Sequence, residues 1–479
     1  MEFVGREHEL ALLHDHLARA GSSLFVLYGR RRIGKTALIE QALRSVPRAA
    51  YHVGTRSTIT EELRRLSKTL ARAWNVPLLD AQPLASPEAL MAFLESQTER
   101  CVLVLDEFPY LAESDASLVG LLQASWDRNL SRSAIKLVCC GSSVSVMEDT
   151  FFGGRSPLFG RRTGQLRLGP LAPRAVARAF AWNPSDAIEL VSLFGGIPGY
   201  LQRLDPELTL LENLRRYVLQ QGEPLYEEIP FLLREELREP RVYHAILATI
   251  GAGSRKFGEI SSKVGLDRAN LTRYLAVLID LGLVEREVPV TERAPERSRK
   301  GLYRISDPFV ATWFTFVHPN RDALERGRVE EVLKEIRPRI ALHVSKAVEP
   351  VLCDLLRAGE LGMMGGLPLE VARAGRYWSP TAEFDVVLFA AAETRAVVVE
   401  VRWTEQPVEA RELDSLRRRV TSEPAFAGVD VTCGVVSRAG FKGRASSDAL
   451  LFDLSSLRWD AHTPTVERVG AVKPRPPEG

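Results

Sequence analysis

Short apolar runs alternate with amphipathic helical patterns along the first 168 residues of the chain. The strand-like runs occupy residues 23–28, 48–53, 101–106, 135–140 and 164–168, and helical patterns lie between them at 36–43, 60–74 and 87–97. Apolar strands linked by helices are typical of parallel sheets that are buried on both faces. The pattern therefore predicts an α/β domain with a five-stranded parallel sheet over residues 1–168.

From about residue 170 the pattern becomes helical, and the run GGIPGY at residues 195–200 interrupts it. We expect a helical lid over residues 169–238. Residues 239–310 then show three helical stretches (242–250, 257–264 and 268–281) followed by two strand-like runs (283–291 and 301–305). This order predicts a winged helix-turn-helix, followed by a helical linker at 311–340.

The last part of the chain returns to an α/β pattern. Helices are expected at 344–356 and 408–420, and strands at 383–390, 396–403 and 429–437. They predict a second α/β domain over residues 341–465. The biased run KPRPPEG at the end predicts a disordered tail over residues 466–479.

The string GRRRIGKT, between the first strand and the first helix of the sheet, matches the phosphate loop G-x-x-x-x-G-K-[ST]. In such loops the backbone N–H groups cradle phosphate, and the following helix directs its N-terminus at the same group. Lys35 is placed to reach the β- and γ-phosphates, and the Thr36 hydroxyl to bind Mg²⁺. The predicted nucleotide-binding residues of this loop are Gly29, Arg30, Arg31, Arg32, Ile33, Gly34, Lys35, Thr36 and Ala37.

The strand CVLVLDE adds an acidic pair about seventy residues later. Asp106 is placed to hold the Mg²⁺ shell, and Glu107 to act as a general base on the attacking water. The alternative is an acidic pair that caps the next helix. After the strand 135–140, Ser142 is placed to sense the γ-phosphate, although small residues after a strand are common in any α/β turn.

Two further segments carry candidate binding residues. The GGIPGY run is either a plain interhelical loop or a lid loop whose Pro198 touches the nucleotide base. In the winged helix, the leucine stripe of the third helix leaves Arg268, Asn270, Thr272 and Arg273 outward, where a recognition helix presents them to a DNA groove. The segment between the two wing strands adds phosphate-binding candidates, which are Arg293, Arg297, Arg299 and Lys300. The alternative is a winged helix that binds protein.

Three acids in the last domain form a candidate metal site. Glu349 lies on its first helix, Asp385 on the strand 383–390, and Glu400 on the strand 396–403. Acids inside apolar strands need a partner, and carboxylates on adjacent strands can converge on a divalent metal. The alternative is that Glu400 pairs with Arg402, two residues further along the same face.

Composition narrows the remaining choices. A net charge of +2 gives no argument for a polyanion partner, so any DNA surface must be a local patch. The five cysteines (Cys101, Cys139, Cys140, Cys353 and Cys433) include no C-x-x-C pair and are expected to be reduced core residues. Neither a signal peptide nor an 18-residue apolar span is present in the sequence, so we expect a cytoplasmic protein without a membrane association.

Several strings resemble a known family. FVGRE, GRRRIGKT, VLVLDEFPYL, CGSSVSVME and SPLFGRRT resemble the archaeal-type ATPases related to the AAA+ and STAND nucleotide switches. The remainder, including GGIPGYL and YRISDPFVATWFTF, is similar to the DUF234 region fused to that ATPase. The resemblance implies that Val4, Gly5 and Arg6 abut the adenine. It also implies an arginine finger, which is Arg161 or Arg162.

The end of the chain also resembles the PD-(D/E)XK nuclease core, with Asp385 and Glu400 as its strand acids and Glu349 as its helical acid. Here Arg402 stands at the position of the family's lysine, and a guanidinium hydrogen-bonds differently from an ammonium. These resemblances imply an ATP-binding, Mg²⁺-dependent ATPase switch, associated with DNA and carrying a nuclease-like domain. The alternatives are an ATP-controlled endonuclease and a signalling scaffold.

Overall fold

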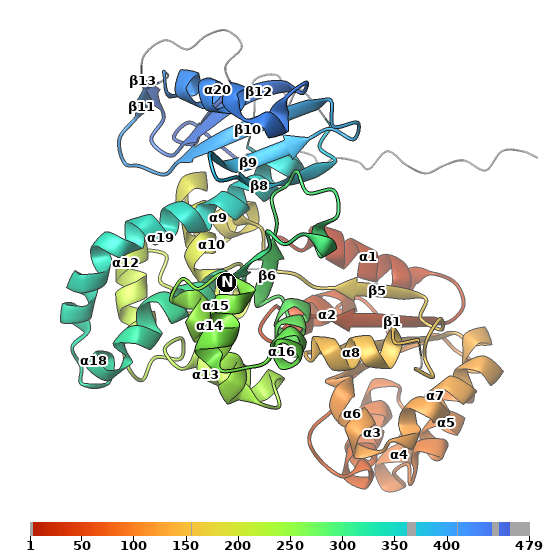
Figure 1. Ribbon diagram of the computed structural model, residues 1–479. Coiled ribbons are helices and arrows are strands. Elements are labelled where there is room, and N and C mark those ends of the chain that lie inside the picture. The colour runs from red at the N-terminus through yellow and green to blue at the C-terminus, as the bar shows by residue number, and fades with distance from the viewer. Residues whose placement is uncertain (1–2, 155, 362–369, 410, 443–449, 460–479) are drawn as a thin grey trace, which may run out of the picture.

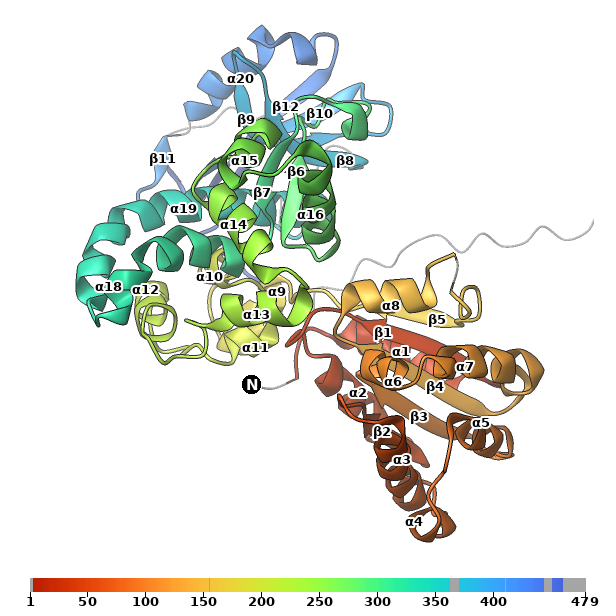
Figure 2. The ribbon, with the colours of Figure 1, turned by 60° about the horizontal axis from the view of Figure 1, so that its bottom comes forward.

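A computed structural model describes residues 3–154, 156–361, 370–409, 411–442 and 450–459 of the chain (Figure 1). Within these ranges no helix is both long and apolar enough to cross a membrane. Figures 1 and 2 both place helices α3 (Ile59–Ala73) and α4 (Leu78–Ala81) at one end of the molecule and the C-terminal sheet at the other.

The N-terminal sheet has five parallel strands in the order β2-β3-β4-β1-β5, as the apolar runs predicted. Its strands are β1 (Ser23–Tyr28), β2 (Ala49–Val53), β3 (Cys101–Asp106), β4 (Ile135–Gly141) and β5 (Gly164–Arg167). Every residue of the three central strands is buried, which explains their continuous apolar sequences. The carboxyl ends of β1, β3 and β4 lie side by side, so the segments that follow them meet at one edge of the sheet.

Helices connect and cover these strands. They are α1 (Glu7–Ala18), α2 (Lys35–Leu43), α3, α4, α5 (Pro87–Glu95), α6 (Phe108–Ser114), α7 (Ser117–Arg128) and α8 (Val144–Phe151), with a 3₁₀ turn at Leu130–Arg132. Thr58 and Ser86 cap α3 and α5 through their hydroxyl groups. The five cysteines are free thiols, as expected, and burial raises the pKa of Cys101 to about 11.

A helical segment follows the sheet. It contains α9 (Pro173–Phe180), α10 (Pro184–Phe194), α11 (Pro198–Leu201), α12 (Leu210–Asn213), a π-helical turn at Leu214–Val218 and α13 (Glu228–Glu236). Residues 195–197 of the GGIPGY run separate α10 from α11, and Pro198, Gly199 and Tyr200 are the first three residues of α11. The run therefore lies between two helices and at the start of the second, rather than in a helix interior, as expected. At Gly196 a Cβ atom would lie 2.0 Å from the Leu171 carbonyl oxygen, so this turn packs directly against the chain that leaves the sheet.

The winged helix is formed by α14 (Pro240–Gly251), α15 (Phe257–Val264), α16 (Arg268–Asp280), β6 (Val284–Glu287) and β7 (Leu302–Ile305), with a 3₁₀ turn at Pro295–Arg297. Its two antiparallel strands are shorter than the predicted runs. The wing segment between them packs on the C-terminal sheet. Val290 donates its N–H to the Arg376 carbonyl at 2.9 Å, and its side chain is buried in the core of that domain.

Helices then lead into the C-terminal sheet. They are α17 (Pro308–Thr312), a π-helical turn (Trp313–Val317), a 3₁₀ turn (His318–Asn320), α18 (Arg321–Glu325) and α19 (Val329–Ala358). The helix α19 runs without interruption through the domain boundary expected at residue 340, although Pro338 and Pro350 lie inside it. In Figure 1 it crosses beneath the C-terminal sheet.

The C-terminal sheet has the strand order β14-β12-β10-β9-β8. Its strands are β8 (Arg373–Trp378), β9 (Glu383–Phe389), β10 (Arg395–Arg402), β12 (Asp430–Ser437) and β14 (Leu450–Asp453). The helix expected at 408–420 is α20 (Glu412–Ser422) instead. Residues Val408–Glu409 form a short strand, β11, paired with β13 (Phe441–Lys442), and a 3₁₀ turn at Pro424–Phe426 follows α20. The predicted disordered tail lies outside the described residues.

Candidate nucleotide site

The predicted phosphate loop connects β1 to α2. Gly34, at the N-cap of α2, has a φ of 96°, which a residue with a side chain rarely adopts. No side chain caps this helix, so its first N–H groups are available to an anion. The Lys35 ammonium is buried and donates to the Gly29 carbonyl at 2.7 Å and the Arg30 carbonyl at 3.0 Å. Burial lowers the pKa of Lys35.

The acid at the end of β3 lies beside this loop. The Thr36 hydroxyl donates to Asp106 Oδ2 at 3.3 Å, and Asp106 Oδ1 accepts the Glu107 N–H at 2.9 Å. A hydroxyl and a carboxylate next to a phosphate cradle are the oxygen ligands that Mg²⁺ prefers in nucleotide sites. Thr36 and Asp106 therefore fit a magnesium ion. Sequence reasoning missed Tyr51 of β2, whose hydroxyl also donates to Asp106 Oδ2.

Glu107 adopts a strained backbone. Its φ of 50° and ψ of 43° lie in the left-handed region, which costs a non-glycine residue about 1–3 kcal/mol. The Ser142 hydroxyl donates to Glu107 Oε1 at 2.5 Å and accepts a hydrogen bond from Lys35 Nζ at 3.0 Å. The side chain of Glu107 makes no capping bond to α6, contrary to the alternative interpretation. Three residues predicted from separate motifs thus meet in one chain of hydrogen bonds.

A cavity of about 1030 Å³ opens above these groups. The predicted residues that line it are Val4, Arg6, Arg31, Arg32, Ile33, Gly34, Lys35, Thr36, Ala37, Asp106, Glu107, Ser142 and Pro198. The lining residues that sequence reasoning missed are Phe3, Glu40, Leu171, Gly199, Gln202 and Arg203. Gln202 and Arg203 lie one helical turn beyond Pro198, and this spacing was the signal that could have found them.

Three predicted residues support the cavity without lining it. Gly29 has a φ of 154°, and a Cβ atom there would lie 2.6 Å from the Leu168 carbonyl oxygen. A Cβ atom on Gly5 would lie 2.2 Å from Ala175 Cβ, so Gly5 allows the N-terminal segment to lie close to α9. Arg30 does not line the cavity and pairs with Asp307 instead. Arg6, which does line the cavity, is buried and donates to the Gly169 and Ile33 carbonyls at 2.5 and 3.3 Å.

The two finger candidates lie elsewhere. Arg161 pairs with Asp127 on α7 at 2.7 Å, and Arg162 lies 4.5 Å from the centroid of the Phe152 ring. Neither arginine lines the nucleotide cavity of its own chain. The finger role therefore has no support from the geometry of a single chain and stays a prediction.

Acids from distant segments hold the arginines of the phosphate loop. Arg32 pairs with Glu228 at 2.9 Å, and Arg31 lies 3.1 Å from Glu235 on the same helix, α13. Arg31 also lies 3.8 Å from Glu236, whose pKa is raised by burial. Arg30 pairs with Asp307, which follows the wing strand β7 and caps α17 through the Val310 N–H at 2.8 Å. The lid and the end of the winged helix are thus tied to the loop that cradles phosphate.

The predicted DNA-binding face is exposed. Arg268, Asn270, Thr272 and Arg273 all lie on the outer face of α16. Asp267 caps this helix by accepting the Asn270 N–H, as predicted, at 2.9 Å. In the wing segment, Arg293, Arg297, Arg299 and Lys300 are also exposed, and Lys300 pairs with Glu292 at 2.8 Å. Part of the wing is committed to the contact between Val290 and β8 described above.

Two of the three acids predicted to form the metal site, Glu349 and Glu400, pair with arginines. Both oxygens of Glu400 are engaged, one by Arg402 at 3.1 Å and the other by Arg419 of α20. Glu349 lies 3.5 Å from Arg376, and its pKa is raised to about 8 by burial and by Asp385. Burial also raises the pKa of Asp385 to about 6, and this side chain accepts the Val401 N–H at 2.8 Å.

These contacts bear on the predicted metal site. Among the described residues, no three His, Cys, Asp or Glu side chains lie together in a group that could hold a metal ion. The pair between Glu400 and Arg402 is the alternative considered from the sequence. Arg402 also bonds Glu412 at 2.6 Å, so its guanidinium bridges two carboxylates.

Three family profiles match successive parts of the chain. Residues 3–204 match an ATPase domain predominantly from Archaea, residues 244–288 match the IclR helix-turn-helix domain, and residues 313–413 match the DUF234 family, described as archaeal and bacterial proteins of unknown function. The chain is 31% identical to an uncharacterised protein of Methanocaldococcus jannaschii over 470 residues, which cover 95% of this chain and 100% of that protein.

Solved structures are also similar. The Walker-type ATPase of Pyrococcus abyssi has a TM-score of 0.48 and 21% identity, covering 64% of this chain and 95% of that one. The ORC2 protein of Aeropyrum pernix has a TM-score of 0.43 and 15% identity, covering 70% of this chain and 95% of that one. Since the relative from M. jannaschii is matched over its whole length, the chain belongs to the archaeal-type ATPase family that carries a helix-turn-helix and a C-terminal DUF234 region.

Proposed function

We propose that the chain is a Mg²⁺-dependent ATPase whose nucleotide state sets the arrangement of the lid, the winged helix and the C-terminal domain. Lys35 and the N-terminus of α2 bind the phosphates, Thr36 and Asp106 hold the magnesium shell, and Glu107 is the base that orients the attacking water. A Mg²⁺ ion held by these two residues would neutralise charge that develops on the phosphate oxygens. The hydrogen bonds that join Lys35, Ser142 and Glu107 support this division of roles.

The proposal of a nucleotide-controlled switch rests on the ion pairs that the arginines of the phosphate loop make. Arg31 and Arg32 line the cavity, yet their guanidinium groups are held by acids of α13. Incoming phosphates attract the same cations, so nucleotide binding and these ion pairs compete. A ligand shifts a conformational equilibrium only through such differential contacts. Binding of ATP is therefore expected to weaken the hold of the lid on the loop.

The substitution Asp307→Asn tests a second link, in which the Arg30 ion pair joins the phosphate loop to the end of the winged helix. It removes the charge that holds Arg30, while the amide oxygen keeps the cap on α17. We expect a non-hydrolysable ATP analogue to change hydrogen exchange in α14–α16 of the wild type and to leave that exchange unchanged in the variant. The matched control is Asp322→Asn, an exposed acid of α18, which should respond like the wild type. An equal response in Asp307→Asn would exclude this ion pair as the link.

We also propose that the winged helix binds duplex DNA through the exposed face of α16. Arg268→Ala and Arg273→Ala should each weaken DNA binding and reduce the slope of log K against log salt by roughly one unit, since one phosphate contact is lost. Basal ATP hydrolysis should stay unchanged. Salt titrations of fluorescence anisotropy measure the slope, with Lys334→Ala on α19 as the control. No retention of the wild type on DNA at low salt would exclude groove binding.

A scaffold role is the second candidate, because the wing already makes a protein contact within the chain through Val290. An ATP-controlled endonuclease is less favoured. Both oxygens of Glu400 are engaged by arginines, so this acid has no free carboxylate oxygen to offer a metal. Assays for plasmid cleavage and for DNA retention separate the three functions.

A further inference from the structure

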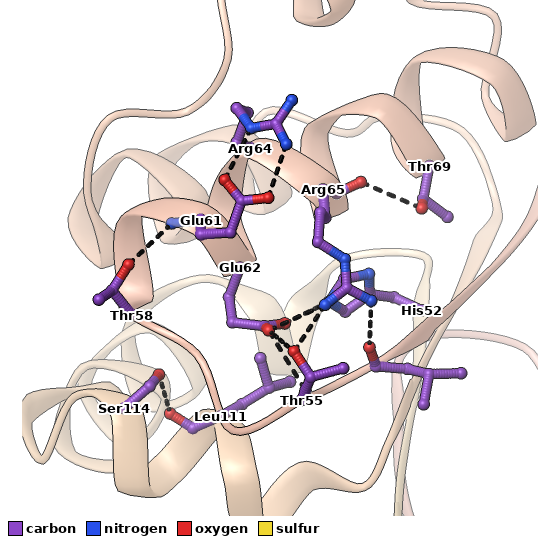
Figure 3. Close-up of polar contacts among 11 residues, drawn as sticks. His52, Thr55, Thr58, Glu61, Glu62, Arg64, Arg65, Thr69, Leu111 and Ser114 are labelled. Carbon is purple, nitrogen blue, oxygen red and sulfur yellow. Dashed lines mark hydrogen bonds and ion pairs between the residues drawn. The ribbon is translucent and has the colours of Figure 1, made fainter.

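We propose that Glu62, a buried acid of α3, is a positioning residue for Glu107, acting through the loop that follows β2. This inference rests on the proposed ATPase function. The loop connects β2 to α3 and begins at Gly54. Figure 3 shows the acid and the polar groups of the loop that surround it.

The first step is that this loop packs on the backbone of Glu107. The strands β2 and β3 are parallel, with Val53 opposite Asp106. The ladder continues one residue further, because the Gly54 N–H donates to the Asp106 carbonyl at 2.8 Å. A Cβ atom on Gly54 would lie 2.9 Å from the Glu107 carbonyl oxygen and 3.0 Å from Leu111 Cγ. The loop therefore lies directly against the residue proposed as the base.

The second step is that Glu62 fastens this loop. Its side chain is 1% exposed, and Oε1 accepts both the N–H of Thr55, at 3.2 Å, and the Thr55 hydroxyl. Thr55 is the residue after Gly54. One carboxylate oxygen thus holds the backbone and the side chain of the same loop residue.

Two further side chains complete the cluster (Figure 3). Arg65 donates to Glu62 Oε1 at 3.1 Å, to the Thr55 hydroxyl at 2.7 Å and to the Val53 carbonyl at 3.2 Å. His52 Nε2 lies 3.2 Å from Glu62 Oε2, and burial lowers the pKa of this ring. The partners of the buried acid lie on the segment 52–55 and on Arg65, one turn further along α3.

The third step concerns the free-energy cost of burying the carboxylate of Glu62. Burying a carboxylate is unfavourable unless it is paired and hydrogen-bonded, and an apolar residue of similar volume often stabilises a core as well. What an acid provides here is a fixed position for residues 53–55. The left-handed backbone of Glu107 persists only where its surroundings hold it. The loop is one of those surroundings, because Gly54 packs against the carbonyl of the strained residue from the side of β2.

A displaced base slows the chemical step without changing how the substrate phosphates are bound. We therefore expect Glu62→Gln to lower kcat by roughly 10- to 100-fold, because a shift of about 1 Å in a reacting group has an effect of this size. The KM for ATP should stay unchanged. The matched control is Glu61→Gln, since Glu61 lies next to Glu62 on α3 but pairs with Arg64 in solvent. This control should keep wild-type kcat.

A double-mutant cycle separates positioning from general destabilisation. In a Glu107→Gln background, Glu62→Gln should cause little further loss of kcat, because the base that it positions is already absent. Losses that multiply, or a fall of kcat in proportion to the unfolded fraction, would overturn the inference. If Glu62→Gln does not fold, Thr55→Val removes the same hydroxyl contact and Thr55→Ser should restore kcat. A wild type that does not hydrolyse ATP would instead overturn the proposed function, and this inference with it.

Discussion

The substitution Glu107→Gln is expected to slow ATP hydrolysis by about 10²- to 10⁴-fold while ATP still binds. The reason is geometric. The carboxylate of Glu107 lies at the cavity, where the Ser142 hydroxyl donates to one of its oxygens at 2.5 Å. In the proposed mechanism this carboxylate orients the attacking water in the transition state. Glutamine keeps the volume and one acceptor oxygen but cannot take a proton. Single-turnover hydrolysis and the equilibrium binding of a fluorescent ATP analogue measure the two properties.

Glu113→Gln is the matched control, because Glu113 lies on the following helix α6, is exposed and does not line the cavity. It should hydrolyse ATP at the wild-type rate. If Glu107→Gln loses binding and turnover in the same proportion, the carboxylate serves the ground state and another group is the base.

The residues of the nucleotide site could be predicted because each motif that contributes to it is a short, continuous stretch of sequence. GRRRIGKT encodes its own turn, and an acid at the end of an apolar strand lies at the edge where parallel strands meet ligands. Lys35, Asp106 and Ser142 meet because β1, β3 and β4 are neighbours in the sheet. The same reasoning could not find Tyr51, since the order of the strands, rather than any motif, brings β2 next to β3.

The ion pairs of the phosphate loop could not be predicted. Glu228 lies almost 200 residues beyond Arg32, and Asp307 lies even further beyond Arg30. No periodic pattern in the sequence links positions so far apart. In the C-terminal domain, an acid inside an apolar strand indicated that Glu400 needed a partner. The sequence offered Arg402 as one, but Arg419 comes from α20, whose start was placed four residues too early.

The C-terminal domain shows a second limit of prediction from the sequence pattern. The strand β8 (RAGRYW) was not expected, because its sequence lacks the alternation of apolar and polar residues. Its partly buried arginines instead pair with acids on β9, on α19 and in the loop between β9 and β10. Prolines normally end helices, since they lack an N–H and clash with the preceding turn. In α19, however, ten buried side chains between Val329 and Leu356 hold one helix together across two prolines. In both β8 and α19, tertiary contacts rather than the local sequence pattern determine the secondary structure.

The substitution Lys35→Ala is expected to lower ATP affinity by about 10²-fold. A hydrogen bond to a charged group contributes about 1.5–3 kcal/mol, and each 1.4 kcal/mol is a factor of ten in affinity. The buried ammonium bonds two carbonyls of its own loop, and its third contact is the Ser142 hydroxyl. Phosphate oxygens that enter the cavity offer it charged acceptors in place of neutral ones.

Lys35→Met separates the charge from the packing, since methionine fills similar space without the ammonium. It should lose affinity as strongly as Lys35→Ala. Calorimetry with ATP and Mg²⁺ gives the dissociation constants, and Lys256→Ala, an exposed cation before α15, should bind like the wild type. Near wild-type affinity in Lys35→Met would show that the ammonium does not meet the phosphates. The cavity would then hold its ligand through the N-terminus of α2 and the loop arginines alone.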